Sequence, residues 1–218
     1  MMDGLESSLK AFESMRSFTL KNSTPPAIIF NPVPADACFD QIQQSIDWNL
    51  PEKVELPEYK EELAFYSVSE LSVLIKTKKI TSTDLTKFFL NRLKKFGDTL
   101  HCIITLTEEL GFKQAQKADE ELANGIYRGP LHGIPYGVKD LLAVEGYKTT
   151  WGAGPFKDQV IEETATIVKK LEQAGAVLIA KLSMGALAMG DVWYRDTTLN
   201  PWNLRQGSSG SSAGSATA

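Results

Sequence analysis

The chain has 218 residues, of which 43% are hydrophobic and 23% are charged, and this composition can bury the core of a globular domain. Its formal net charge of −4 argues against a dedicated nucleic-acid-binding protein, because such proteins present a basic surface. The two histidines and two cysteines match no zinc pattern, so we expect no catalytic metal. The cysteines, Cys38 and Cys102, form either two buried thiols, which is the commoner case, or a single disulfide.

No apolar run approaches the roughly 20 residues that a membrane-spanning helix needs. The first twenty residues carry Asp3, Glu6 and Glu13 and lack an uninterrupted apolar core, so they do not match a secretory signal. We therefore expect a cytoplasmic protein without a membrane partner, provided that no leader precedes residue 1.

Residues 1–60 are predicted to form an arm, and residues 61–218 the folded domain. Prolines in the arm interrupt helices and central strands alike. Only residues 5–18 have a helical pattern. The prolines are Pro25, Pro26, Pro32, Pro34, Pro51 and Pro57.

Regular structure is predicted from about residue 69 onward, because apolar residues there recur at helical spacing between capping and turn residues. In chain order we expect a helix from about residue 69, a helix from residue 81 or 82 to Gly97, a strand at 102–106, and a helix at 108–124 that ends at Gly125.

The second half begins with a Gly/Pro turn that leads into a short apolar strand within residues 129–142. An amphipathic helix follows at 162–174, closed by Gly175, and a compact apolar strand at 177–180. A strand, helix and strand at this spacing predict a right-handed βαβ crossover in a parallel or mixed sheet.

Lys139 is the first candidate for catalysis. It follows the run Ile134–Val138, so it emerges from a core strand and not from a solvated helix. Burial disfavours a charged ammonium and favours the neutral amine, which is a strong base. The alternative, which spacing alone favours, is a structural lysine that reaches solvent or pairs with Asp140.

Residues 207–218 consist almost entirely of Gly, Ser and Ala. This composition suits a flexible linker, which composition alone favours. It also suits a phosphate-binding loop, although the Lys-Ser/Thr ending of a P-loop is missing. The third interpretation is a catalytic loop, in which small residues let a substrate approach several hydroxyl groups.

Five segments occur in a fixed order: GPLHGIPYGVKDLL (129–142), KTTWGAG (148–154), ETATIVKKLEQAGAVLIAKLSM (163–184), NPWNL (200–204) and GSSAGS (210–215). In order and spacing they resemble the amidase-signature family over residues 129–218. The resemblance implies an α/β fold in which a mixed β-sheet has helices on both faces. It also implies that this chain holds the N-terminal part of that fold.

That family uses a Ser–cis-Ser–Lys triad, one of the Ser-Lys variants of serine catalysis. The resemblance makes Lys139 the lysine and Ser211 the cis-serine, with Gly210 and Ser212 beside it in the loop. A register three residues earlier would select Ser208, but it shortens the spacing from the NPWNL segment and loses the GSSAGS match.

The resemblance implies a proton relay that needs no cofactor. Neutral Lys139 accepts a proton from Ser211, whose hydroxyl takes the proton of a nucleophilic serine. The nucleophile attacks the amide carbonyl and forms an acyl-enzyme, which water hydrolyses. The family carries this nucleophile further along the chain than residue 218, so we expect the chain alone to be inactive.

Other residues of these segments have support or packing roles in our interpretation. Asp140 is expected to orient the Lys139 strand through hydrogen bonds. Met184 and Met189 flank a predicted short helix, where the family lines its substrate pocket and where core packing is nearly as common. We interpret as structural His132, Trp193–Arg195 and the loop anchor Trp202.

Three functions are open. The leading hypothesis is an amidase that hydrolyses the C–N bond of a small-molecule amide, alone or as a homodimer. The second is the A subunit of a tRNA-dependent glutaminyl or asparaginyl amidotransferase, which depends on B and C subunits. It ranks lower because residues 185–194 and the Pro-rich arm differ from that subunit's usual sequence. The third is a truncated, non-catalytic chain.

Overall fold

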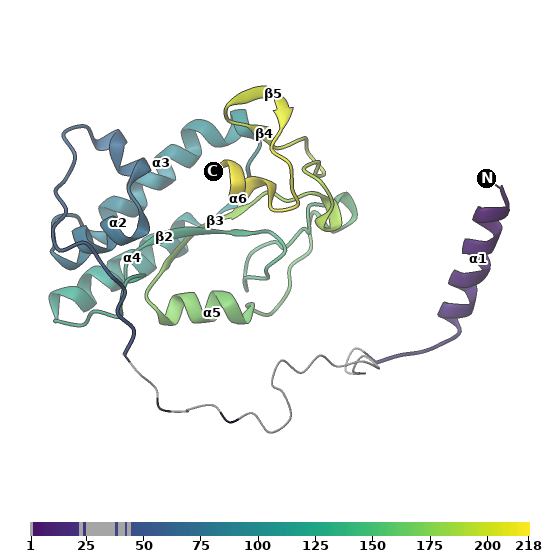
Figure 1. Cartoon of the computed structure of the whole chain (residues 1–218), viewed down its shortest axis with the longest axis horizontal. Coiled ribbons are helices and arrows are strands. Elements are labelled where there is room, and N and C mark those ends of the chain that lie inside the picture. Colours follow the sequence, from purple (N-terminus) through teal and green to yellow (C-terminus); the bar gives the residue numbers. More distant parts are fainter. Residues whose placement is uncertain (1, 22–23, 25–37, 39–41, 43–44) are drawn as a thin grey trace. The chain divides into compact units, whose positions relative to one another are not determined.

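The computed structural model describes residues 2–21, 24, 38, 42 and 45–218, with backbone only for residues 2–3. It separates into two units, Met1–Ile46 and Asp47–Ala218. Helix α1 (Met2–Arg16) belongs to the first unit and covers most of the helix predicted at residues 5–18 (Figure 1). The rest of the described regular structure belongs to the second unit.

The second unit is an α/β fold, as the sequence predicts. Each predicted helix and strand after residue 60 is present with shifted ends. In order, the elements are η1 (Lys60–Phe65), α2 (Val68–Lys76), α3 (Ser82–Leu100), β1 (Ile103–Leu106), α4 (Glu108–Ala123), β2 (Pro135–Lys139), η2 (Gly154–Phe156), α5 (Thr166–Gln173), β3 (Val177–Leu182), η3 (Ala186–Ala188), β4 (Leu199–Asn200), β5 (Asn203–Gly207) and α6 (Ala213–Thr217).

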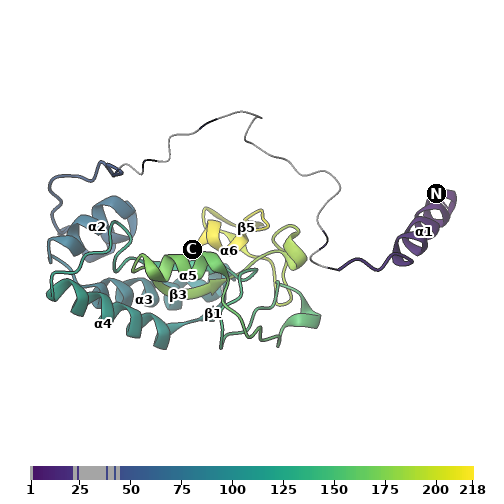
Figure 2. The same cartoon turned by 90° about the horizontal axis from the view of Figure 1, so that it is seen from below.

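A mixed three-stranded sheet lies at the centre, in the order β1-β3-β2. The central strand β3 pairs antiparallel with β1 and parallel with β2, and α5 connects the two parallel strands. Val177 and Ile179 of β3 pack with residues of α3 and α4, whereas Leu178 between them packs with Val168 of α5. Helices therefore cover both faces of the sheet, because successive strand residues point to opposite faces (Figures 1 and 2).

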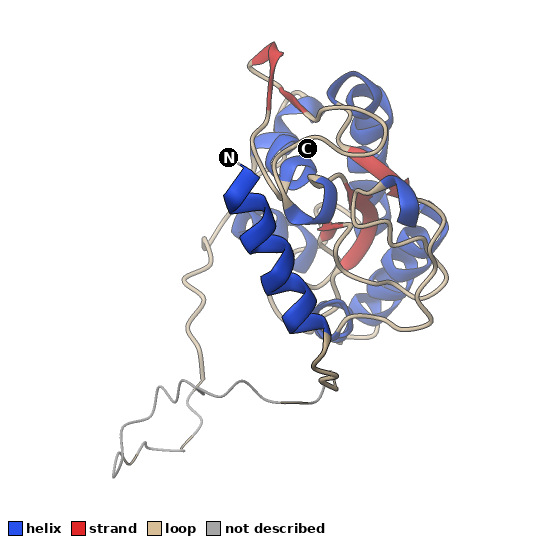
Figure 3. Ribbon diagram, turned by 90° about the vertical axis from the view of Figure 1, so that its right-hand side faces the viewer, coloured by secondary structure: helices blue, strands red, loops and turns tan. Residues whose placement is uncertain are grey.

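Strands β4 and β5 form a separate antiparallel hairpin (Figure 3). Trp202 at its turn has 94% of its surface exposed. The prediction that Trp202 anchors the loop is therefore wrong, because no described residue buries its indole. Asn200 instead shapes the turn, since its side-chain oxygen accepts a hydrogen bond from the Trp202 N–H at 2.9 Å.

The third helix of the chain, α3, extends beyond its predicted end. Gly97 was expected to stop it, but Gly97 is buried inside the helix, and a Cβ at this position would lie 2.1 Å from Cδ1 of Ile103. The glycine makes room for β1 and does not end the helix. The left-handed residue that ends it is His101, with φ of 51°.

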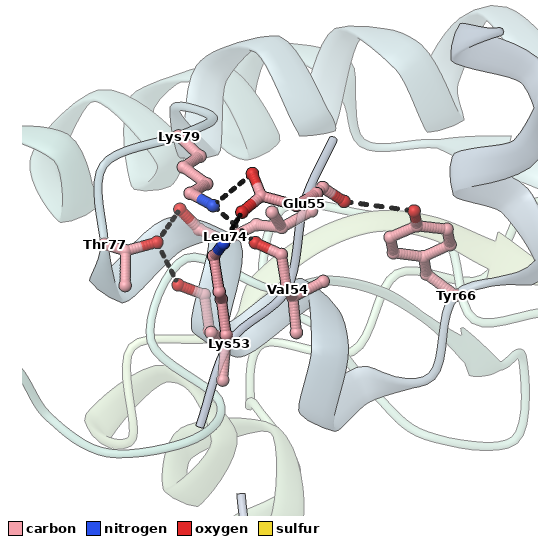
Figure 4. Close-up of polar contacts among 8 residues, drawn as sticks. Lys53, Val54, Glu55, Tyr66, Leu74, Thr77 and Lys79 are labelled. Carbon is pink, nitrogen blue, oxygen red and sulfur yellow. Dashed lines mark hydrogen bonds and ion pairs between the residues drawn. The ribbon is translucent and has the colours of Figure 1, made fainter. Parts of the chain in front are cut away.

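The folded unit begins at Asp47, before the boundary at residue 61 that the proline pattern predicts. Val54 is buried in a cluster with Leu63, Leu74 and Ile80. Lys79 holds the same segment by donating hydrogen bonds to the Val54 carbonyl at 2.7 Å and to the Glu55 carboxylate at 2.6 Å (Figure 4). Apolar burial and one lysine thus bring part of the predicted arm into the domain.

Candidate functional site

Lys139 and Ser211 meet although 72 positions separate them in the sequence. Lys139 is the last residue of β2, and its Nζ donates a hydrogen bond to Ser211 Oγ over 2.8 Å. Both side chains are half-buried, and the Gly210–Ser211 peptide bond is cis. The arrangement places an amine in direct contact with a hydroxyl, and a proton can pass between them when the amine is neutral.

The loop that carries Ser211 is attached to the segment that follows β3. The Gly185 N–H donates to the Ser211 carbonyl at 3.1 Å, and the Gly214 N–H donates to the Ser183 carbonyl at 2.8 Å. Ser183 in turn is held by its N–H, which donates to the Cys102 carbonyl at 2.8 Å. The central strand β3 is therefore linked to both residues. The segment that follows β3 holds the loop of Ser211, and β2, which pairs with β3, carries Lys139.

Two glycines allow this loop to pack closely. A Cβ on Gly210 would lie 1.8 Å from the Gly190 carbonyl oxygen, and a Cβ on Gly214 would lie 2.4 Å from the Ser183 nitrogen.

The alternative register, which selects Ser208 in place of Ser211, is not the one that contacts Lys139. Ser208 Oγ donates to the carbonyl of Ser209, and its N–H donates to the Thr198 carbonyl.

Asp140 does not pair with Lys139, which was the structural alternative. Its carboxylate forms an ion pair with Lys181 at 2.8 Å, and both side chains are fully buried. The second carboxylate oxygen accepts hydrogen bonds from the Thr150 N–H at 2.7 Å and from the Thr150 hydroxyl. The Asp140 backbone N–H donates to the Leu182 carbonyl at 3.0 Å, which continues the pairing of β2 with β3 by one residue.

Lys181 is a buried charged residue that the sequence pattern alone does not single out. Its ammonium also donates to the Lys148 carbonyl at 2.5 Å and to the Thr149 hydroxyl at 2.6 Å. Burial lowers the pKa of Lys181, and the hydrogen bond and charge of Asp140 oppose that effect. A lysine inside the apolar run Val177–Leu182 signals a buried partner, but only the fold identifies that partner as Asp140.

A family model described as Amidase matches residues 84–218. The chain belongs to the amidase family. The fold and the order of the segments from residue 129 onward agree with this membership.

Similar proteins cover this amidase chain only in part. The A subunit of glutamyl-tRNA(Gln) amidotransferase from Carboxydothermus hydrogenoformans is 35% identical over 158 residues, which are 71% of this chain and 33% of that protein. The protein of the same name from Nitrosomonas europaea is 39% identical over 155 residues, 70% of this chain and 32% of that protein. The peptide amidase structure from Stenotrophomonas maltophilia has 30% identity and a TM-score of 0.65, covering 71% of this chain and 34% of that chain. The chain therefore spans about a third of the length of its curated relatives.

The residues predicted to support the site have different environments. Met184 is fully buried, and the short helix η3 follows it, so Met184 is a core residue. Met189 lies after η3 with 77% of its surface exposed. Ser212 is exposed beside Ser211 and precedes α6.

His132 is structural, as predicted. It is buried, its Nε2 lies 2.9 Å from the Ala118 carbonyl, and its Nδ1 lies 3.4 Å from the Arg128 N–H. These contacts fit a neutral ring that donates from Nε2 and accepts at Nδ1. Trp193 is buried and packs edge-to-face on Tyr194, with their ring centroids 5.0 Å apart, which confirms its packing role.

Both cysteines are free. Cys102 is buried, and burial raises the pKa of its thiol to about 11, whereas Cys38 is exposed, contrary to the expectation of two buried thiols.

Within residues 2–21, 24, 38, 42 and 45–218, no three His, Cys, Asp or Glu side chains gather in a way that could hold a metal ion. None of the helices in these ranges is long and apolar enough to span a membrane.

Proposed function

We propose that this amidase hydrolyses a carboxamide C–N bond and that Lys139 and Ser211 are the proton relay of a Ser–cis-Ser–Lys mechanism. The observation that carries the proposal is the 2.8 Å contact between Lys139 Nζ and Ser211 Oγ at the end of a core strand. Membership of the amidase family supports the reaction class.

In the proposed mechanism the neutral amine of Lys139 takes the Ser211 proton while Ser211 takes the proton of a nucleophilic serine. The nucleophile adds to the amide carbonyl, the C–N bond breaks, and the returning proton leaves with ammonia or an amine. Water then hydrolyses the ester by the same relay in reverse. We assign no residue of this chain as the nucleophile, because the chain spans only about a third of the length of its relatives.

The test uses the full-length protein that carries this chain and a panel of amides comprising glutamine, a peptide C-terminal amide and an anilide. Lys139→Met and Ser211→Ala should each lower kcat/KM by about a thousandfold or more, because the loss of one member of a catalytic unit costs about as much activity as the loss of all its members. Ser215→Ala is the matched control, since Ser215 is an exposed serine of α6, four positions from Ser211. Turnover that survives Lys139→Met, or robust hydrolysis by the 218-residue chain alone, would refute the proposed mechanism.

A second candidate is the glutamine-hydrolysing A subunit of a tRNA-dependent amidotransferase. The observation in its favour is the name of the curated relatives, which are 35% and 39% identical to this chain. The two functions differ in their dependence on partners. An amidase acts alone on its amide, whereas an amidotransferase component should hydrolyse glutamine efficiently only when its partner proteins and the acceptor tRNA are added.

A further inference from the structure

The side chain of Asp191 holds the loop that carries Ser211, although Asp191 lies 18 positions before the residue it binds. Its Oδ2 accepts a hydrogen bond from the Ser209 N–H at 3.0 Å, two residues ahead of Ser211. Ser209 has a φ of 64°, in the left-handed region that residues other than glycine rarely adopt. The acceptor on its N–H therefore stabilises a backbone conformation that a serine does not prefer.

The same carboxylate occupies the space beside Gly207. A Cβ on Gly207 would lie 2.0 Å from Asp191 Oδ2 and 2.8 Å from its Cγ. No lysine, arginine or histidine among the described residues forms an ion pair with Asp191. The Ser209 N–H is thus the partner that the structure gives to this carboxylate, and a hydrogen bond to a charged acceptor is stronger than one between neutral groups.

The backbone of Asp191 is anchored as well, so its carboxylate has a defined position. The Thr198 N–H donates to the Asp191 carbonyl at 3.0 Å, and the Thr198 carbonyl accepts a hydrogen bond from the Ser208 N–H at 2.8 Å. Thr198 is fully buried, and its hydroxyl lies 2.6 Å from the buried hydroxyl of Ser183. Asp191 therefore holds the loop from a position that is tied to the segment after β3.

The two loop residues that follow Ser209 contact the segment just before Asp191. Gly210 packs against the Gly190 carbonyl, and the Ser211 carbonyl accepts a hydrogen bond from the backbone N–H at position 185. These contacts involve backbone atoms of both segments. The contact of Asp191 is made by a side chain, so it can be changed by substitution without altering the others directly.

We infer that Asp191 is a positioning residue for Ser211: its carboxylate holds Ser209 and thereby keeps the Ser211 hydroxyl within reach of Lys139. Asp191 acts through the loop and transfers no proton. The effect of this positioning on amide hydrolysis rests on the proposed function, whereas the hydrogen bond to the Ser209 N–H does not.

The test uses the full-length protein that carries this chain and removes the contact in two ways. Asp191→Ala deletes the carboxylate. Gly207→Ala keeps the charge but displaces it from Ser209, because the new Cβ needs the space of Oδ2. Both variants should lower kcat about 10- to 100-fold on the amide of the panel that is hydrolysed fastest, with KM changed less than about threefold, since a catalytic group displaced by about 1 Å loses activity on this scale.

Two further variants separate a positioning role from a general loss of charge. Asp191→Asn keeps an acceptor oxygen for the Ser209 N–H and should recover most of the lost kcat. Asp196→Asn is the matched control, because Asp196 is an exposed carboxylate of the same segment whose side chain accepts a hydrogen bond from the Thr197 N–H and not from the loop. It should keep the wild-type kcat.

Hydrogen exchange measures the contact without any substrate. Overlapping peptides that isolate the Ser209 amide should show exchange at least about tenfold faster in Asp191→Ala and in Gly207→Ala than in wild type, because the amide has lost its acceptor. In the double variant, Gly207→Ala should add little to the effect of Asp191→Ala, since the smaller side chain leaves room for the new Cβ.

A loss of kcat together with faster Ser209 exchange in both alanine variants, reversed by Asp191→Asn, supports the inference. Unchanged Ser209 exchange, a raised KM with unchanged kcat, or an Asp191→Asn enzyme as impaired as Asp191→Ala would overturn it. If thermal melts show that Asp191→Ala does not fold, Gly207→Ala decides, and wild-type kcat and exchange in that variant count against the inference.

The two readouts also separate the inference from the proposed function. Faster Ser209 exchange in Asp191→Ala, together with a Ser211→Ala enzyme that stays active, would preserve the hold on the loop and remove the proposed relay. Loss of activity in Ser211→Ala with full activity in Asp191→Ala would preserve the relay and remove the positioning role.

Discussion

Glu55 joins the segment that leads into the domain to Tyr66, which precedes α2, and to Lys79, in the turn that follows α2. Its carboxylate lies 2.6 Å from Lys79 Nζ and 2.9 Å from Lys53 Nζ, and its backbone carbonyl accepts a hydrogen bond from the Tyr66 hydroxyl at 3.1 Å (Figure 4). The hydrogen bonds from Lys79 and then Lys53 lower the pKa of Glu55 to about 2. One exposed residue, Glu55, thus makes several of the contacts that hold the segment 53–55 in place.

The lowered pKa of Glu55 predicts a pH-dependent contribution to stability. The stabilising effect is present above the unfolded pKa of 4.5 and is lost as the pH falls from that value towards 2, because protonation removes the charge that the lysines bind. Glu55→Gln should therefore lower Tm at pH 7 by a small amount, and the difference from wild type should vanish near pH 2. Glu58→Gln, at an exposed carboxylate of the same segment, should show no such convergence in thermal melts.

Single residues divide into those whose role follows from local sequence and those whose role depends on the fold. Lys139 and Ser211 were predicted because each lies in a recognisable segment. Lys181 was not, because its partner Asp140 lies 41 positions away, on another strand, and no local pattern encodes that pairing. Trp202 was misinterpreted for the same reason, since its burial depends on distant chain and not on its neighbours.

At the scale of elements, a capping residue made the start of α3 predictable, whereas α2 begins at a capping box that lies before the predicted residue 69. Ser67 and Glu70 form a capping box at the start of α2, and the Thr81 side chain accepts a hydrogen bond from the Asp84 N–H at the start of α3. Helix ends were less predictable because a glycine has two uses. Gly125 has a positive φ after α4 as expected, whereas Gly97 provides room for a neighbouring strand.

Helix α6 depends on a glycine that cannot be replaced without moving the backbone. A Cβ on Gly214 would lie 2.4 Å from the Ser183 nitrogen and 2.5 Å from the Cys102 carbonyl oxygen. Gly214→Ala should therefore cost about 2 kcal/mol or more in the free energy of unfolding, and it should displace Ser211. Urea unfolding of this variant is compared with Ser215→Ala, an exposed position on the same helix, which should be close to wild type. A stable Gly214→Ala protein would contradict the close packing.

For the folded unit as a whole, the edge of the sheet at β2 is the surface on which we expect association with other chains. Strand β2 is an edge strand, and beside it lies an open cavity of about 750 Å³ lined mostly by apolar side chains of α3, β2 and the β4–β5 hairpin. Phe65 and Trp202 line this cavity with 85% and 94% of their surface exposed. Unpaired strand edges beside apolar surface favour association with other chains.

The 218-residue chain expressed alone is therefore expected to self-associate through this cavity. Phe65→Glu combined with Trp202→Glu should shift the weight-average mass measured by sedimentation towards the monomer. The unfolding free energy should stay within about 0.5 kcal/mol of wild type, because both side chains are already exposed. Ile167→Glu is the matched control, since Ile167 is an exposed apolar residue of α5 that does not line the cavity. A reduction in mass by Ile167→Glu equal to that of the cavity variant would show that general surface hydrophobicity, not the cavity beside β2, drives the association.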